Sequence, residues 1–192
     1  MSAAVVERAQ ADAGRSIDST MGFSALDGLA MGTRPGALDP GVVLHLIREK
    51  NMTADDVEKL LYGKCGLLGL SGISNDMRDL ETSSDPNARE AIDYFVYRAS
   101  QGLGTMAAAM GGVDGIVFTA GVGENSPTIR AAICRAAQWM GVELDEAANE
   151  TGGPRISTTN SSVSAWVIPT DEEKMMALHT LDLISKGELP AS

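Results

Sequence analysis

The stretch FTAGVGENSPTIR, residues 118–130, places two glycines, a carboxylate and an amide between an apolar segment and a proline that can start a helix. A strand, a tight glycine turn and a helix N-terminus would together present unpaired N–H groups and a positive dipole end, which bind anions. Gly121 and Gly123 would let a phosphate or a flat base approach the main chain, and Asn125 could bond to that ligand or only cap the turn. The pattern is neither GxGxxG nor a P-loop, so a glycine turn needed only for packing remains an alternative.

A second candidate is Arg34, which lies in the glycine-rich loop MGTRPG directly before a proline that favours an extended backbone. Such a guanidinium can hold a carboxylate or a phosphate through two parallel hydrogen bonds. The alternative is an ordinary solvated loop arginine.

The third candidate is SNDMRD, in which Asp76 and Arg78 flank Met77. These side chains offer an acceptor, a cation that can stack on a ring and a flexible apolar surface, which together would suit a purine and its ribose. A short helix with an internal ion pair explains the same residues equally well.

The fourth candidate is VIPTDEEK, residues 167–174. Thr170 and Glu173 have the spacing of a capping box at the start of the last helix. Asp171 and Glu172 would then follow the carboxyl end of a strand, where ligands of open α/β sheets bind, and Glu172 could hold a hydrated magnesium ion. Alternatively, both are simply favourable charges on a helix dipole.

The elements that must position these residues alternate between helices and strands. Residues 20–41 contain five glycines and two prolines without a sustained period, which predicts a structured loop. Asp39 can cap a helix at about 40–50, Thr53 with Asp56 can open one over 54–63, and Ser74 or Asn75 can cap a turn through 76–78. The later elements are a long core helix at about 87–110, a buried strand at 115–119, a helix over 127–140 that Gly141 ends, a strand at 162–169 and a helix at 171–185.

Composition limits the kinds of partner. The chain has 192 residues, 44% of them hydrophobic, and a net charge of -11, which disfavours nucleic acid and anionic membranes as partners. Cys65 and Cys134 form no CxxC or Cys/His spacing, so we interpret them as small buried residues of a protein in the reducing cytoplasm. No apolar run reaches the roughly 20 residues of a membrane helix. Strands alternating with helices indicate an α/β domain.

The order of these stretches resembles the C-terminal half of acetate kinase and its propionate and butyrate kinase relatives. The resemblance extends from about Arg15 to Leu183 and rests on DSTMGFSALDGLAMGTRPGALDPG, GLLGLSGISNDMRD, AIDYFVYRASQGLGTMAAAMGGVDGIVFTAGVGENSPTIR and VIPTDEE. It implies the fold shared by acetate and sugar kinases, Hsp70 and actin, of which this would be the ribonuclease H-like C-terminal lobe, a mixed sheet with flanking helices.

The resemblance also implies roles for the candidate residues. Arg34 matches an arginine that contacts the transferring phosphoryl group and the acyl substrate, and Glu172 matches a magnesium-associated glutamate. The other matches are to residues of the ATP or ADP site, and the candidates there are Asp76, Met77, Arg78, Gly121, Val122, Gly123 and Asn125.

Members of that family also carry an N-terminal lobe with catalytic Asn, Arg and Asp residues and a His-Leu-Gly-Asn-Gly loop, which we do not find in this sequence. We therefore expect residues 1–14 to be a weakly patterned segment and residues 15–192 to be a nucleotide-binding and dimerisation lobe. This lobe would bind Mg²⁺-nucleotide, have little activity on acetate or a similar carboxylate alone, form a homodimer, and pair with a separate N-terminal lobe. One alternative is a noncatalytic nucleotide-binding or dimerisation module that acts with another chain, and another is a degenerate gene fragment without function.

Overall fold

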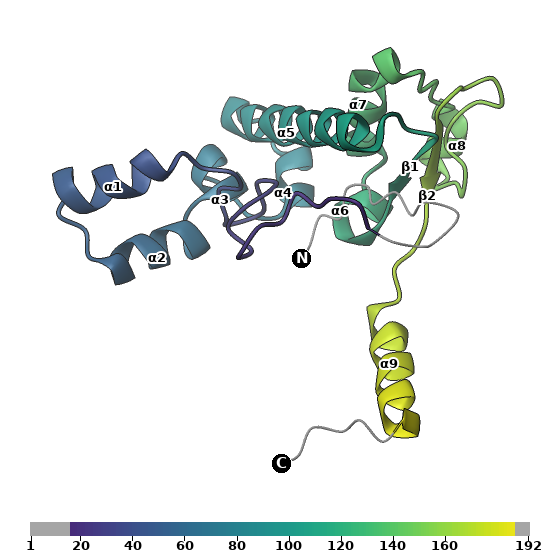
Figure 1. Ribbon diagram of the computed structural model, residues 1–192. Helices are drawn as coiled ribbons and strands as arrows, with labels where there is room; N and C mark the ends of the chain where they lie inside the picture. Colours follow the sequence, from purple (N-terminus) through teal and green to yellow (C-terminus); the bar gives the residue numbers. More distant parts are fainter. Residues whose placement is uncertain (1–15, 187–192) are drawn as a thin grey trace.

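The structure, a computed structural model of the chain, describes residues 16–186 apart from the side chain of Glu172 (Figure 1). The predicted segment 1–14 lies outside these residues. In chain order the elements are α1 (Pro40–Glu49), α2 (Ala54–Gly63), α3 (Gly66–Ser71), α4 (Met77–Thr82), α5 (Pro86–Met110), β1 (Gly115–Phe118), α6 (Ala120–Asn125), α7 (Pro127–Ala136), the 3₁₀ helix η1 (Gln138–Met140), α8 (Glu146–Glu150), β2 (Ser164–Val167) and α9 (Glu172–Lys186).

The sheet is a parallel pair in which Gly115 is opposite Ser164 and Phe118 is opposite Val167. An isolated parallel bridge and two isolated antiparallel bridges lie beside it. The predicted α/β class is confirmed, whereas the sheet of the described residues is parallel and not mixed. Because the two strands are parallel and in register, both end at the same edge. The segments that follow them, which lead into α6 and α9, therefore start side by side.

The long helix α5 forms the centre of the core, packing on α3, α4 and α7 (Figure 1). Its buried side chains recur every three or four residues, as the sequence predicts. Three of the six are alanines, whose small side chains let neighbouring helices approach closely. The six residues are Ala88, Ala91, Phe95, Ala99, Leu103 and Met106.

The predicted helix starts at Asp39 and Thr53 are confirmed. Asp39 accepts a hydrogen bond from the N–H of Gly41, and Thr53 forms a complete capping box with Asp56. Both caps are local to the sequence. Their side chains satisfy N–H groups that the helix itself leaves unpaired.

Three predicted helix boundaries are wrong by a few residues. Asp76 caps α4 in place of Ser74 or Asn75, because the hydroxyl of Ser74 already accepts from the N–H of Asp76. Asp171 accepts from the N–H of Lys174 and so replaces Thr170 as the cap of α9, since Thr170 pairs its hydroxyl with another threonine, Thr119. The helix predicted to reach residue 140 ends at residue 136 as α7. A separate 3₁₀ helix, η1, follows it and ends at Gly141, which is left-handed.

Two parts extend from this core (Figure 1). The helices α1 and α2 pack on each other at the end farthest from the sheet, and α1 has no buried residue. The helix α9 stands apart and exposes Met175, Met176 and Leu181. Within residues 16–186, no helix combines the length and the apolar character needed to cross a membrane.

Candidate functional site

A pocket of about 420 Å³ lies between α4 and α6, a size typical of small-molecule sites. It brings together six of the seven predicted nucleotide residues. These come from two groups, 76–78 and 121–125, which lie more than 40 positions apart in the sequence. These six residues are Asp76, Met77, Arg78, Gly121, Val122 and Asn125.

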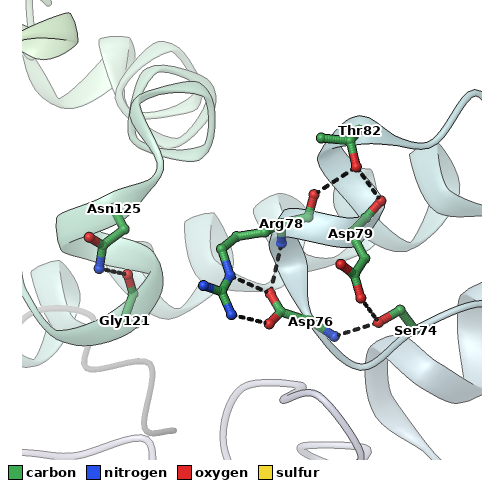
Figure 2. Close-up of polar contacts among 7 residues, drawn as sticks. All are labelled: Ser74, Asp76, Arg78, Asp79, Thr82, Gly121 and Asn125. Atoms are coloured by element: carbon green, nitrogen blue, oxygen red, sulfur yellow. Dashed lines mark hydrogen bonds and ion pairs between the residues drawn. The ribbon is translucent and has the colours of Figure 1, made fainter.

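The first wall is the start of α4, where Asp76 and Arg78 form a two-pronged ion pair (Figure 2). One carboxylate oxygen accepts from the main-chain N–H of Arg78 at 2.9 Å and from Nε at 3.0 Å, and the other accepts from Nη2 at 2.5 Å. The side-chain bond to Arg78, followed by the main-chain bond, lowers the pKa of Asp76 to about 2. The predicted internal ion pair is therefore confirmed, and the same pair lines the pocket.

The second wall is α6, and here the predicted tight glycine turn is wrong because residues 120–125 form a short helix. Local side-chain bonds offset the helix-breaking tendency of its two glycines. The amide of Asn125 donates to the carbonyl of Gly121 at 2.8 Å (Figure 2). The helix begins at Ala120, which has a φ of 56°, a left-handed conformation that is costly for a residue with a side chain.

Glu124 stabilises this unusual helix start, and the sequence analysis did not single it out. Its Oε1 accepts from the N–H of Ala120 at 2.7 Å and from the N–H of Thr170 at 2.8 Å. These two donors follow β1 and β2, so one carboxylate joins the segments that leave both strands. The available signal is its spacing, since Glu124 lies four residues after Ala120.

Gly123, the seventh predicted residue, does not line the pocket. It lies where α6 meets the end of β1, and a Cβ added there would be 3.2 Å from the carbonyl carbon of Phe118. The position therefore favours glycine for close packing of the helix on the strand.

A buried arginine holds the other end of α6. Arg130 is 1% exposed and donates from Nη1 to the carbonyls of Gly123 and Glu124, at 3.1 and 2.8 Å. Its Nε and Nη2 donate to the side-chain and main-chain oxygens of Asn149, at 2.8 and 2.6 Å. Burial lowers the pKa of Arg130, yet an arginine remains charged at neutral pH.

Arg34 lies beside the pocket and not in its lining. Its guanidinium contacts the sulfur of Met31, which does line the pocket, and lies 5.8 Å from the centre of the Tyr62 ring. The first turn of α3 holds this loop, because N–H groups of residues 65, 67 and 68 donate to the carbonyls of residues 33, 31 and 32. Gly66 permits the close approach: it has a φ of 60°, and a Cβ there would be 2.0 Å from the carbonyl oxygen of Met31.

The pocket has further lining residues that the sequence analysis did not assign to it. Glu81 could have been found by spacing, since it lies one helical turn after Met77 and shares its face of α4. The others reach the pocket through tertiary contacts that no local pattern signals. The additional lining residues are Met31, Gly32, Leu67, Asn75, Glu81, Phe95 and Ser126.

A more open hollow lies at the strand ends, lined in part by Glu124, Asp171 and Glu173. The side chain of Glu172, the predicted magnesium ligand, lies outside the described residues. Within the described part of the chain, no three His, Cys, Asp or Glu side chains are grouped as metal ligands. Magnesium in kinases needs only one or two carboxylates in addition to water and phosphate oxygens, so the acidic residues here fit such an ion.

The chemistry of the main pocket fits a ligand with a flat apolar part and a polar or anionic part. Met77, Phe95 and Val122 offer apolar surface, whereas Asn125 and Arg78 offer hydrogen bonds and positive charge. Nη1 of Arg78 is not part of the ion pair with Asp76 and can donate to a ligand.

Comparison with known proteins identifies relatives over most of the chain. The model of the acetokinase family matches residues 4–178. The acetate kinase of Nitrobacter hamburgensis is 57% identical over 171 residues, which make up 89% of this chain and 42% of that protein. The crystal structure of Porphyromonas gingivalis acetate kinase matches with a TM-score of 0.83 and 39% identity, over 89% of this chain and 44% of that one. A propionate kinase from Francisella tularensis matches with a TM-score of 0.81 and 34% identity, over 91% and 44%. This chain therefore spans less than half the length of these relatives.

Proposed function

This chain belongs to the acetokinase family and has its actin-like ATPase fold, and from that premise we propose that it forms the nucleotide-binding lobe of a carboxylate kinase. The reaction would transfer the terminal phosphoryl group of ATP to acetate or a similar short carboxylate and give an acyl phosphate. The observation that carries the proposal is the pocket between α4 and α6, because it brings together two short helices that are distant in sequence.

The side chains of the two walls would contact different parts of a bound ATP or ADP. Met77 and Val122 would contact the base, and Asn125 and Arg78 would bond to polar groups of the nucleotide. The pairing of Asp76 with Arg78 fixes the direction of the guanidinium before a ligand arrives, which reduces the entropy lost on binding.

Phosphoryl transfer requires positioning of the reactants and neutralisation of charge on the transferring group. Arg34 would contribute a positive charge beside the pocket, held in place by the α3 contacts of its loop. Glu172, with its neighbours Asp171 and Glu173, would hold Mg²⁺, which when bound neutralises phosphate oxygens.

The proposal extends to the oligomeric state, the N-terminal lobe and the cellular compartment. We expect a homodimer and the need for an N-terminal lobe to complete the acyl site. Light scattering of the chain, alone and with the N-terminal half of a relative added, tests both. Free Cys65 and Cys134 are compatible with a reducing cytoplasm.

The decisive test is calorimetric titration with ATP and ADP in the presence of Mg²⁺. We expect saturable binding that Arg78→Ala weakens about tenfold, because it removes a cation that can stack or donate at the pocket. Arg89→Ala is the matched control, since Arg89 is equally exposed and paired with Asp93 on the surface of α5. Absence of binding at millimolar nucleotide, or equal effects of the two substitutions, would contradict the proposal.

A hydroxamate assay for acyl phosphate separates the catalytic and noncatalytic versions. Little turnover by this chain alone, restored by a supplied N-terminal half, is the expected result. In the restored enzyme, Arg34→Ala should raise the activation free energy of turnover by roughly 3 to 5 kcal/mol, with little change in nucleotide affinity. Nucleotide binding without any turnover, even with the added half, would favour the noncatalytic module.

A further inference from the structure

A hydrogen bond between two side chains links the two walls of the pocket directly. The hydroxyl of Ser126 donates to Oε1 of Glu81 at 2.6 Å, across 45 positions of sequence. Ser126 is 4% exposed at the junction of α6 and α7, whereas Glu81 is half-buried on α4. Both residues line the pocket.

The hydroxyl of Ser126 also takes part in a second hydrogen bond. The N–H of Ile129 donates to the same hydroxyl at 3.1 Å, as expected for a serine that caps α7. A carboxylate oxygen can only accept, so the one hydrogen of the serine hydroxyl is directed to Glu81 while the serine oxygen accepts from Ile129. Hydrogen bonds to a charged acceptor are also stronger than neutral ones.

The two walls pack mainly on other helices. The helix α4 packs on α5, α6 packs on α7, and α5 in turn meets α7 (Figure 1). The distance between Met77 and Asn125 across the pocket is therefore set in part by α5 and α7. The pair of Glu81 and Ser126 bypasses them, because Glu81 is one turn after Met77 and Ser126 directly follows Asn125.

We propose that Glu81 and Ser126 are positioning residues that set the spacing of the two walls for the base of the bound nucleotide. The part that concerns the nucleotide rests on the function proposed above. The pair lies beside the residues proposed to contact the base, so we expect it to affect ligands that carry a base and to leave binding of a bare polyphosphate unchanged.

The test uses substitutions that separate this link from the helix cap. Ser126→Asp keeps a good N-cap for α7 but cannot donate to Glu81 and repels it. Adding Glu81→Gln supplies an amide that can donate to the new carboxylate and so restores the link. Asp85→Ser, which exchanges one good N-cap for another at the start of α5, is the control for cap substitution alone.

Two measurements are made on each protein. Hydrogen exchange of the amides at residues 121–126, without ligand, reports whether the walls are joined. Calorimetry with ATP and with tripolyphosphate reports whether the base is positioned.

For Ser126→Asp we expect exchange to be about tenfold faster and ATP affinity about tenfold weaker, with tripolyphosphate affinity unchanged, since a hydrogen bond to a charged group is lost. The double variant should return both values to within about threefold of the unaltered chain, and Asp85→Ser should change neither.

Failure of the double variant to restore exchange would overturn the link, and equal weakening of ATP and tripolyphosphate would overturn the role in positioning the base. If the unaltered chain binds no ATP, the proposed function and the nucleotide part of this inference both fall. The exchange measurement still decides whether the pair joins the walls.

Discussion

Replacing Arg130 by methionine should destabilise the chain and loosen α6. The guanidinium is buried and makes four hydrogen bonds, all to oxygens of Gly123, Glu124 and Asn149. Methionine retains much of the apolar volume of the arginine stem. The substitution therefore tests the hydrogen bonds and the charge more than the packing.

The magnitude follows from what happens to the four acceptors. The carbonyls of Gly123 and Glu124 lie in a half-buried region and can be hydrated. Asn149 is 0% exposed, so its two oxygens lose their arginine partner out of reach of water, at about 1–3 kcal/mol each. Removing a buried charge recovers part of this loss, because its desolvation no longer opposes folding. We expect a net decrease of about 3 kcal/mol in the free energy of unfolding.

Urea denaturation followed by circular dichroism measures this change. Arg135→Met is the matched control on the same helix, since Arg135 is 58% exposed and pairs with the equally exposed Glu146. Its loss should cost no more than about 1 kcal/mol, as for other surface pairs. A cost below about 1 kcal/mol for Arg130→Met, or equal costs for both variants, would refute the reasoning.

Three further predictions concern single positions. The carboxyl of Asp76 should titrate near pH 2 by NMR, and Arg78→Gln should move this midpoint back up. Because the pKa is lowered in the folded chain, the stabilising contribution of Asp76 is complete above its ordinary pKa of 3.8 and is lost as the pH falls toward 2. Gly123→Ala should lower the free energy of unfolding by about 1 kcal/mol because of the clash with β1, whereas Gly63→Ala, with open space around its Cβ, should raise it by about 0.5 kcal/mol. Burial raises the pKa of Cys134 to about 12, so iodoacetamide at pH 8 should modify it only after urea unfolding, as measured by mass spectrometry.

The helices were predictable where their signals are local. The caps at Asp39 and Thr53 and the apolar spacing of 87–110 depend on residues within one or two turns, and the structure confirms them. The short helix α6 was missed because its two glycines oppose helix formation by propensity. The compensating bonds come from Glu124 and Asn125, whose effect depends on the local geometry.

The structure brings most of the predicted nucleotide residues to one pocket, while their roles in binding stay a prediction. Asp76, Met77 and Arg78 lie in one motif and the residues of α6 in another. Types and spacing made each set a candidate, and the family resemblance assigned both to a nucleotide. The link between the sets could not be predicted, because the bond of Glu81 to Ser126 joins residues whose separate roles in sequence are those of a helical carboxylate and an N-cap.

Arg34 is held in place mainly by main-chain hydrogen bonds between its loop and α3. The carbonyls of residues 31–33 take the N–H groups that α3 would otherwise leave unsatisfied at its first turn. This arrangement replaces a side-chain cap, since Cys65 at the N-cap position of α3 makes no side-chain cap bond. The loop is therefore anchored to α3, and Thr33 anchors it to α2 through the carbonyl of Tyr62. Arg34 is thus positioned independently of α6, so the proposed contact with the phosphoryl group and the proposed contacts with the base depend on different parts of the fold.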